Sequence, residues 1–264
     1  YGIDPEIIPT PSSWINGVRM ANVMLDRYVD ENGCYPKSIG FIIWATDTMK
    51  TGGDDVAYIL WLLGVRPTWM SNGRIRCLEV IPLGELGRPR IDVAVRITGL
   101  FRDSFPNLIS LINDAVSMVS DLDESDEENY LSANLRREIA EQIESGLDEA
   151  SARELSMIRV FGGRSGSYGA GLNHAIENRN WNDAGDLAKM YVTWGGCGFS
   201  SDGREIFMEE TFVRKLSSAD IGIKNMPDRQ MDVFTGDDVY GYLGGLAALA
   251  KADGREMRLY VGDG

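Results

Sequence analysis

The sequence predicts an α/β fold in which a mainly parallel sheet carries helices on both faces, in Rossmann-like layers, with an extra helical insertion. The run "SIGFIIWAT" over Ser38–Thr46 is continuously apolar and of strand length, which is typical of a strand buried on both faces of a parallel sheet. Strand-like runs then alternate with helical patterns along the chain. With 264 residues, 44% of them hydrophobic and 25% charged, the chain is long enough to bury a sizeable core.

The first part of the chain is expected to begin with a long helix. Apolar residues at helical spacing, after a Pro-Thr-Pro-Ser-Ser start that offers caps, predict this helix over Ser12–Asp30. The strand at Ser38–Thr46 leads into a turn at Lys50–Asp55 and a second helix that ends near Leu63. Before the next helix, Phe105–Val119, short strands are expected at Val65–Trp69, Cys77–Ile81 and Ile91–Thr98.

An acidic linker follows, because six of the eight residues in Asp121–Glu128 are acids. A charged helical stretch over Leu131–Leu155 completes the predicted insertion, residues 121–156. It separates one α/β part, residues 1–120, from a second, residues 157–264, within one compact unit. In the second part we expect strands at Met157–Phe161, Ala219–Lys224 and Met257–Val261, and helices at Gly169–Glu177, Asp183–Trp194, Ser201–Lys215 and Gly236–Lys251.

The composition excludes several classes of protein. With 40 acidic and 26 basic residues the net charge is −14, which disfavours binding to nucleic acid. No apolar run reaches the roughly 18–20 residues that a membrane helix needs. The three cysteines (Cys34, Cys77 and Cys197) are scattered, so we expect neither a disulfide scaffold nor a cysteine zinc site, and we expect a reducing, cytoplasmic setting. The chain starts without Met and stops directly after a strand-like run, which suggests a piece of a longer protein.

Several enzyme motifs are missing. Lys50-Thr51-Gly52-Gly53 lacks the spacing of a Walker A loop, so ATP hydrolysis is not expected in this chain. No Gly-x-Ser-x-Gly elbow occurs, and the single histidine, His174, is expected to be structural. No Gly-x-Gly-x-x-Gly follows the first strand, which argues against a dinucleotide site.

The candidate ligand-binding residues lie in five segments, in which glycines and polar residues follow the carboxyl ends of predicted strands. Open α/β sheets bind ligands at this edge. The first runs from Trp44 to Asp54 and is equally consistent with an ordinary strand–turn–helix joint. The second contains Arg96 inside an apolar strand and Arg102-Asp103 just beyond it. An arginine there could clamp a carboxylate, and the alternative is pairing with internal acids.

The other three segments follow later strands. Val160–Gly171 has a glycine-rich loop whose backbone N–H groups suit an anion. Trp194–Gly198 is expected to be a helix end with a tight turn. Asn225–Tyr240 contains acids that could hold a hard cation through oxygen ligands, with Asp228 and Asp232 as the metal candidates, or could serve only in turns and caps.

Taken in order, these segments resemble one family. The strings "GRPRIDVAVRITGLFRDSFPN", "RVFGGRSGSYGAGL", "WGGCGF" and "KNMPDRQMDVFTGDDVYGYLGG", together with the earlier "PTPSSW" and "IIWATDTMKTGGDDVAYILWLLGVRPTW", are similar to the large subunit of cobaltochelatase and magnesium chelatase, of the CobN type or the magnesium chelatase H type. The similarity covers nearly the whole chain. It implies a fragment near the carboxyl end of a much longer subunit.

The resemblance implies an ATP-dependent metal chelatase. The large subunit would bind a tetrapyrrole substrate and insert Co²⁺ into a corrin precursor or Mg²⁺ into protoporphyrin, while separate AAA+ partner subunits hydrolyse ATP. The tetrapyrrole-binding candidates that follow are Arg96, Arg102, Asp103, Gly162, Arg164, Tyr168, Gly169 and Trp194, with Arg90 and Arg229 as further partners for acid side chains and Trp44, Phe101 and Phe161 as further aromatic walls. In the alternative hypothesis, the fragment is a non-catalytic scaffold to which the AAA+ partner subunits bind.

Overall fold

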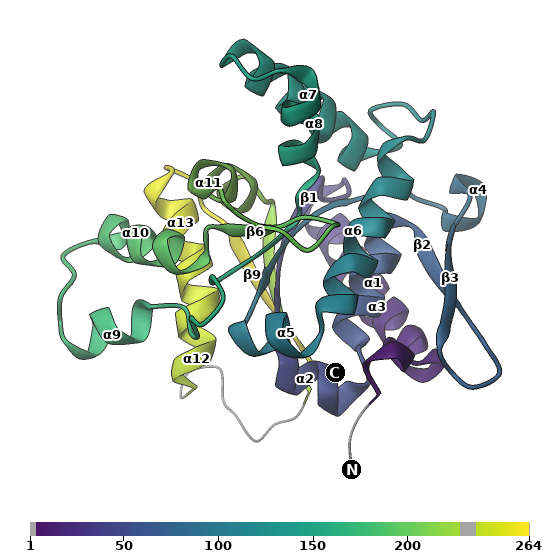
Figure 1. The fold of residues 1–264 in the computed structure, drawn as a ribbon, viewed down its shortest axis with the longest axis horizontal. Helices are drawn as coiled ribbons and strands as arrows, with labels where there is room; N and C mark the ends of the chain where they lie inside the picture. Colours follow the sequence, from purple (N-terminus) through teal and green to yellow (C-terminus); the bar gives the residue numbers. More distant parts are fainter. Residues whose placement is uncertain (1–3, 228–235, 264) are drawn as a thin grey trace.

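A computed structural model describes residues 4–227 and 236–263 and contains the predicted parallel sheet (Figure 1). The sheet has the strand order β7-β6-β5-β4-β1-β8-β9. Its parallel part consists of β1 (Ser38–Ile43), β4 (Asp92–Ile97), β5 (Val160–Gly162), β8 (Ile221–Met226) and β9 (Arg258–Asp263). Strands from both predicted α/β parts therefore share one sheet.

Helices cover both faces, as predicted. On one face, α1 (Pro11–Asn32), α3 (Asp54–Leu63) and α6 (Pro106–Ser120) pack on alternate residues of β1, including Ile39 and Phe41. On the other face, α10 (Ala184–Gly195), α11 (Glu209–Ser217) and α13 (Gly245–Ala252) pack around Ile42. This alternation follows from the two-residue period of a strand, and a continuous apolar run satisfies both faces at once.

Glycines permit close packing at two places. Gly40 of β1 and Gly222 of β8 are paired in register, and a Cβ atom at Gly222 would lie 2.7 Å from Leu246 Cδ2 of α13. At Gly17, where α1 approaches α3, a Cβ atom would lie 2.6 Å from the carbonyl oxygen of Asp54. A larger side chain at either position would push a helix away from its neighbour.

The predicted insertion is helical. It contains α7 (Tyr130–Glu144) and α8 (Glu149–Met157), which stand at one end of the molecule in Figure 1. Buried charges fasten it to the sheet: Arg159 lies 2.7 Å from Asp92 and 3.4 Å from Glu138 of α7, and Lys215 of α11 also bonds Glu138. All four side chains are at most 6% exposed.

The sequence predictions and the structure differ at three places. The expected helix end is confirmed, since α10 ends at Gly195 with Gly196 as its C-cap, but the segment then continues into a strand, β6 (Cys197–Phe199). The helix expected over Ser201–Lys215 begins only at Glu209, because β7 (Glu205–Phe207) pairs antiparallel with β6. A short helix, α5 (Gly99–Ser104), follows β4, and Thr98 caps it by accepting a hydrogen bond from the Phe101 N–H.

The remaining elements are short. They are η1 (Pro5–Ile7), α2 (Ala45–Thr51), the hairpin of β2 (Val65–Trp69) and β3 (Ile75–Val80), α4 (Leu83–Leu86), α9 (Leu172–Glu177), α12 (Asp237–Val239) and a π-helical turn, η2 (Tyr240–Gly244). No helix of the described ranges combines the length and apolarity needed to cross a bilayer.

Candidate functional site

The segments singled out by the sequence meet at the carboxyl edge of the sheet. A pocket of about 180 Å³ is lined there by Trp44–Thr46 after β1, Thr98–Leu100 after β4, Tyr168 and Gly169 after β5, and Asp238 and Tyr242. Trp194 lies against the same glycine loop, since a Cβ atom at Gly171 would lie 2.5 Å from its indole ring. Three aromatic side chains, Trp44, Tyr168 and Tyr242, therefore stand around one concavity.

Arg102 organises the glycine loop instead of facing the pocket. Its Nη1 donates to the carbonyls of Gly163 (2.8 Å), Ser167 (3.3 Å) and Arg164, while Nε and Nη2 donate to the two oxygens of Asp103 at 2.7 and 3.0 Å. The side chain is only 5% exposed. Hydrogen bonds to a charged donor are stronger than neutral ones, so this one guanidinium fixes the course of the loop.

Tyr168 is held at the rim by the same group of residues. Its hydroxyl donates to Asp103 Oδ2 at 2.7 Å, and its ring lies over the Arg102 guanidinium. Tyr168 itself is 59% exposed. The hydrogen bonds from Arg102 and Tyr168 hold the pKa of Asp103 below its ordinary value. Gly99 makes this arrangement possible, because a Cβ atom there would lie 2.5 Å from the Ser167 carbonyl oxygen.

Arg96 is buried beneath the pocket and fully enclosed. Its guanidinium lies 5.1 Å from the ring centre of Tyr242 and 5.6 Å from that of Tyr191, and it donates to the carbonyls of Ile97 and Trp194. No carboxylate among the described residues forms an ion pair with it. Arg96 Nε, Tyr191 Oη and Trp44 Nε1 also have no hydrogen-bond partner there. A buried, uncompensated cation favours an anion in the adjacent pocket.

A second buried polar cluster lies where β1 and β8 end. Lys224 Nζ lies 2.5 Å from Asp47 Oδ2 and 4.5 Å from the Trp44 ring centre, so it supports one wall of the pocket from behind. Asn225 Nδ2 donates to Asp55 Oδ1 at 2.7 Å. The sequence analysis missed Lys224, Asp55 and Tyr242. Lys224 could have been found from the sequence, because it is a charged residue inside an apolar strand, as Arg96 is.

Among the described residues no cation contacts the Asp55 carboxyl directly, and burial raises its pKa to about 6, against the opposing effect of Lys224. Because the folded pKa lies above the unfolded value of 3.8, the folded state binds the proton more tightly, and stability falls as pH rises from about 4 to about 6. We therefore expect Asp55→Asn to stabilise the chain at pH 7 by about 2–3 kcal/mol.

Urea unfolding of the Asp55→Asn variant at several pH values checks this expectation. The gain in the free energy of unfolding should vanish near pH 4. Asp26→Asn, on the exposed surface of α1, is the matched control and should leave the pH curve unchanged. A loss of stability at pH 7 for Asp55→Asn would show that the carboxylate is needed in its charged form.

Other candidates lie elsewhere. Arg90 precedes β4 at the opposite, amino edge of the sheet, where it bonds Glu124 and the carbonyls of Gly64 and Ile81. Arg164 is exposed and stacks on Phe207 at 4.3 Å from the ring centre. The remaining three are buried in the packed interior: Phe101, Phe161 and Gly162.

The metal candidates Asp228 and Asp232, with Arg229, lie outside the described residues. Within the described part of the chain, no three His, Cys, Asp or Glu side chains gather in a way that could hold a metal ion. The described geometry therefore supplies aromatic walls, a loop fixed by Arg102 and a buried charge.

Comparison with known proteins gives the family. The family model for CobN/Magnesium Chelatase matches residues 1–264. The aerobic cobaltochelatase subunit CobN of Pseudomonas aeruginosa is 39% identical over the whole chain, and the magnesium-chelatase subunit ChlH of Oryza sativa subsp. indica is 35% identical. An uncharacterized protein of Methanocaldococcus jannaschii is 46% identical.

A solved structure of a related protein has the same fold. The catalytic subunit of cobaltochelatase from Mycobacterium tuberculosis superposes with a TM-score of 0.93 at 40% identity, covering 100% of this chain and 22% of that one. The chain likewise spans 21% of the length of the CobN of Pseudomonas aeruginosa and 19% of the ChlH of rice. On this match along its entire length, the chain belongs to the CobN/magnesium chelatase family.

Proposed function

We propose that this chain forms one wall of the tetrapyrrole cleft in the large subunit of an ATP-dependent chelatase that inserts Co²⁺ or Mg²⁺. The observation that carries the proposal is the meeting of Trp44, Tyr168 and Tyr242 around one pocket at the carboxyl edge of the sheet. Flat aromatic faces suit a flat macrocycle, and this edge is where open α/β sheets hold ligands.

The size of the pocket limits what it takes. A volume of about 180 Å³ accommodates the edge of a macrocycle rather than all of it. We therefore propose that other regions of the large subunit form the opposite wall. The acidic side chain of the tetrapyrrole would enter this pocket, where the buried charge of Arg96 lies behind the Tyr242 ring.

The chain's own residues would bind and orient the substrate. Metallation exchanges two pyrrole protons for one divalent ion, so it needs a fixed macrocycle, a proton acceptor and ligands that remove water from the metal. The loop fixed by Arg102 would hold the macrocycle edge in one position, and Tyr168 would cover it at the rim. ATP hydrolysis would belong to AAA+ partner subunits, since the sequence contains no Walker A loop.

A second candidate function is docking of the AAA+ subunits without contact to the tetrapyrrole. Dispersal of the candidate segments over opposite faces would favour it. The segments after β1, β4 and β5 instead line one pocket, which supports the cleft.

The test is a titration of the chain with deuteroporphyrin, followed by fluorescence. We expect saturable binding that Tyr168→Ala weakens by roughly tenfold, because the exposed ring and its contact area are lost. Tyr130→Ala, at the start of α7 and beside Arg90 at the amino edge, is the matched control and should bind like the parent. No saturable binding, or equal affinity for both variants, would favour the docking function.

A further inference from the structure

Each aromatic side chain around the pocket at the carboxyl edge carries a cation on its ring. The three pairs are Lys224 Nζ at 4.5 Å from the Trp44 ring centre, Arg96 at 5.1 Å from that of Tyr242, and Arg102 at 5.6 Å from that of Tyr168. The aromatic side chains line the pocket, whereas none of the three cations does. Arg96 and Lys224 are completely buried, and the Arg102 side chain is 5% exposed. The pocket is therefore surrounded by rings that have positive charge behind them.

The cations change what the rings offer to a ligand. An aromatic ring is negative on its two faces and positive at its edge, and a cation is attracted to one of the faces. The cation draws the π electrons toward itself, so the opposite face becomes less negative. Because Lys224 and Arg96 are fully buried, the ring face that each of them covers is closed, and a ligand meets the rest of the ring. These rings therefore attract positive charge less than isolated aromatic rings do.

Arg96 supplies the charge that is not compensated. Lys224 is paired with Asp47, and Arg102 is paired with Asp103, so the fields of these two cations are partly cancelled. No carboxylate of the described residues pairs with Arg96. Since the low dielectric constant of the interior screens a buried charge poorly, its field extends through the Tyr242 ring into the pocket.

The groups that oppose Arg96 are few and well screened. Asp238 lines the pocket, but it is exposed, and water weakens the field of an exposed charge. Tyr191 packs on the Arg96 guanidinium at 5.6 Å from the ring centre. Burial raises the pKa of Tyr191, so this phenol stays neutral and adds no negative charge.

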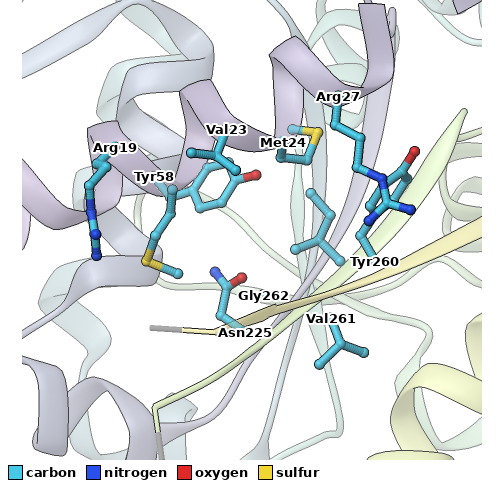
Figure 2. A pocket seen from close by; sticks show the side chains of 11 residues that line it. Arg19, Val23, Met24, Arg27, Tyr58, Asn225, Tyr260, Val261 and Gly262 are labelled. Carbon is cyan, nitrogen blue, oxygen red and sulfur yellow. The ribbon is translucent and has the colours of Figure 1, made fainter. Parts of the chain in front are cut away.

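The pocket between α1 and the strands β8 and β9 has the opposite arrangement (Figure 2). There Arg27 lies over the Tyr260 ring, 5.1 Å from its centre, and both side chains line the pocket themselves. Glu31 pairs with Arg27 at 2.9 Å, and the two side chains of this pair are 66% and 36% exposed. Water and the acid screen this cation, so its field on a ligand is weak compared with that of Arg96.

We propose that the pocket at the carboxyl edge selects a macrocycle by the charge at the macrocycle's centre, and that Arg96 is the residue that determines this selection. The proposal rests on the tetrapyrrole cleft proposed above. A macrocycle with a neutral or negative centre is favoured, and one with a positive centre is disfavoured. The pocket thereby favours rings that have lost N–H protons, or that hold a divalent ion, over rings that have gained protons or hold a trivalent ion.

The test compares the palladium(II) and gold(III) complexes of deuteroporphyrin on the full chain, followed by the absorption of the macrocycle. Both ions have the same number of d electrons and form flat complexes, so the two ligands differ by one unit of charge at the centre and share the same peripheral acids. We expect the palladium(II) complex to bind roughly tenfold more tightly. This is the effect of one charge about 10 Å away at an effective dielectric constant of about 20.

The overall charge of the chain predicts the opposite order. A net charge of −14 attracts the more positive complex, so surface electrostatics alone would favour gold(III). Salt separates the two effects, because it screens exposed charges more than buried ones. The preference for palladium(II) should therefore persist in about 0.5 M salt, where the Debye length is only a few ångströms.

Two variants test the role of Arg96. Arg96→Met removes the charge and keeps an unbranched side chain, and the two complexes should then bind with equal affinity. Arg88→Met is the matched control. Arg88 is also buried and stacks on Trp61 at 5.2 Å from the ring centre, but it donates to the carbonyls of Trp61 and Leu62 at the end of α3. Its replacement should leave the preference for palladium(II) unchanged. Circular dichroism checks that both variants fold, and the comparison on the parent chain needs no variant.

The outcomes distinguish this proposal from the cleft on which it rests. Saturable binding of both complexes with equal affinity, or tighter binding of gold(III), would overturn the charge selection and leave the cleft in place. A folded Arg96→Met variant that still prefers palladium(II) tenfold would remove Arg96 as the determinant. If neither complex binds saturably, the cleft itself is refuted, and the charge selection with it.

Discussion

Arg159→Met is expected to lower the free energy of unfolding by about 3–5 kcal/mol. The guanidinium of Arg159 is 1% exposed and bonds Asp92 at 2.7 and 3.3 Å. It also bonds Glu138 and the carbonyl of Ser156. Without it, the donors that the buried Asp92 carboxylate keeps among the described residues are the Asn134 amide and the Val93 N–H. A buried charge that loses its partner is costly, because water does not replace the missing charge.

The measurement is urea unfolding at pH 7, with Arg204→Met as the matched control. Arg204 also contacts two acids, Glu154 and Asp202, but its side chain is 58% exposed. Solvent screens exposed pairs, so the control should lose less than about 1 kcal/mol. Equal losses for the two variants would contradict a structural role for the buried cluster. We also expect the amides of α7 to lose exchange protection first in Arg159→Met, since Glu138 ties that helix to the sheet.

Arg102→Met should both disorder the glycine loop and weaken porphyrin binding. The loop carbonyls of Gly163 and Ser167 lose their donor, and Asp103 loses its charged partner. We expect the free energy of unfolding to fall by about 2–4 kcal/mol, from several hydrogen bonds to one charged group. Deuteroporphyrin affinity should fall by more than about tenfold, because Tyr168 is no longer held over the pocket.

Arg164→Met separates positioning from direct contact. Arg164 lies in the same loop but is exposed and only stacks on Phe207, so its replacement should cost less than about 1 kcal/mol of stability. Hydrogen exchange at the Ser167 amide, which donates to the Arg164 carbonyl at 2.9 Å, reports loop order in both variants. Porphyrin affinity that falls in Arg164→Met and persists in Arg102→Met would assign the substrate contact to Arg164.

The sequence alone determined the class of the fold and the place of the candidate site. A strand buried on both faces shows as an unbroken apolar run, and the run over Ser38–Thr46 predicted the buried strand that the structure has as β1, Ser38–Ile43. Helix starts are equally local: Thr10 caps α1 by accepting from the Ser13 N–H, with Pro11 at the first helical position. Crowding of glycines and polar residues after strands placed the candidate site at the carboxyl edge.

Short strands escaped the sequence analysis for a physical reason. β6 and β7 are three residues long, and β6 contains a glycine, so their conformation depends on pairing with β5 and with each other. A strand of three residues is too short to show the alternation of a strand. The predicted helix over Ser201–Lys215 therefore includes the residues of β7 as well as most of α11.

Only the tertiary structure decided the partners of the buried charges. The sequence showed that Arg96 and Arg102 needed partners, but not that Arg102 would bind the loop 61 residues away or that Arg96 would meet aromatic rings instead of an acid. Lys224 likewise reaches Asp47 across 177 residues. Hydrophobic periodicity is a property of neighbouring residues, whereas these contacts depend on the order of strands in the sheet, which is set by packing of the whole chain.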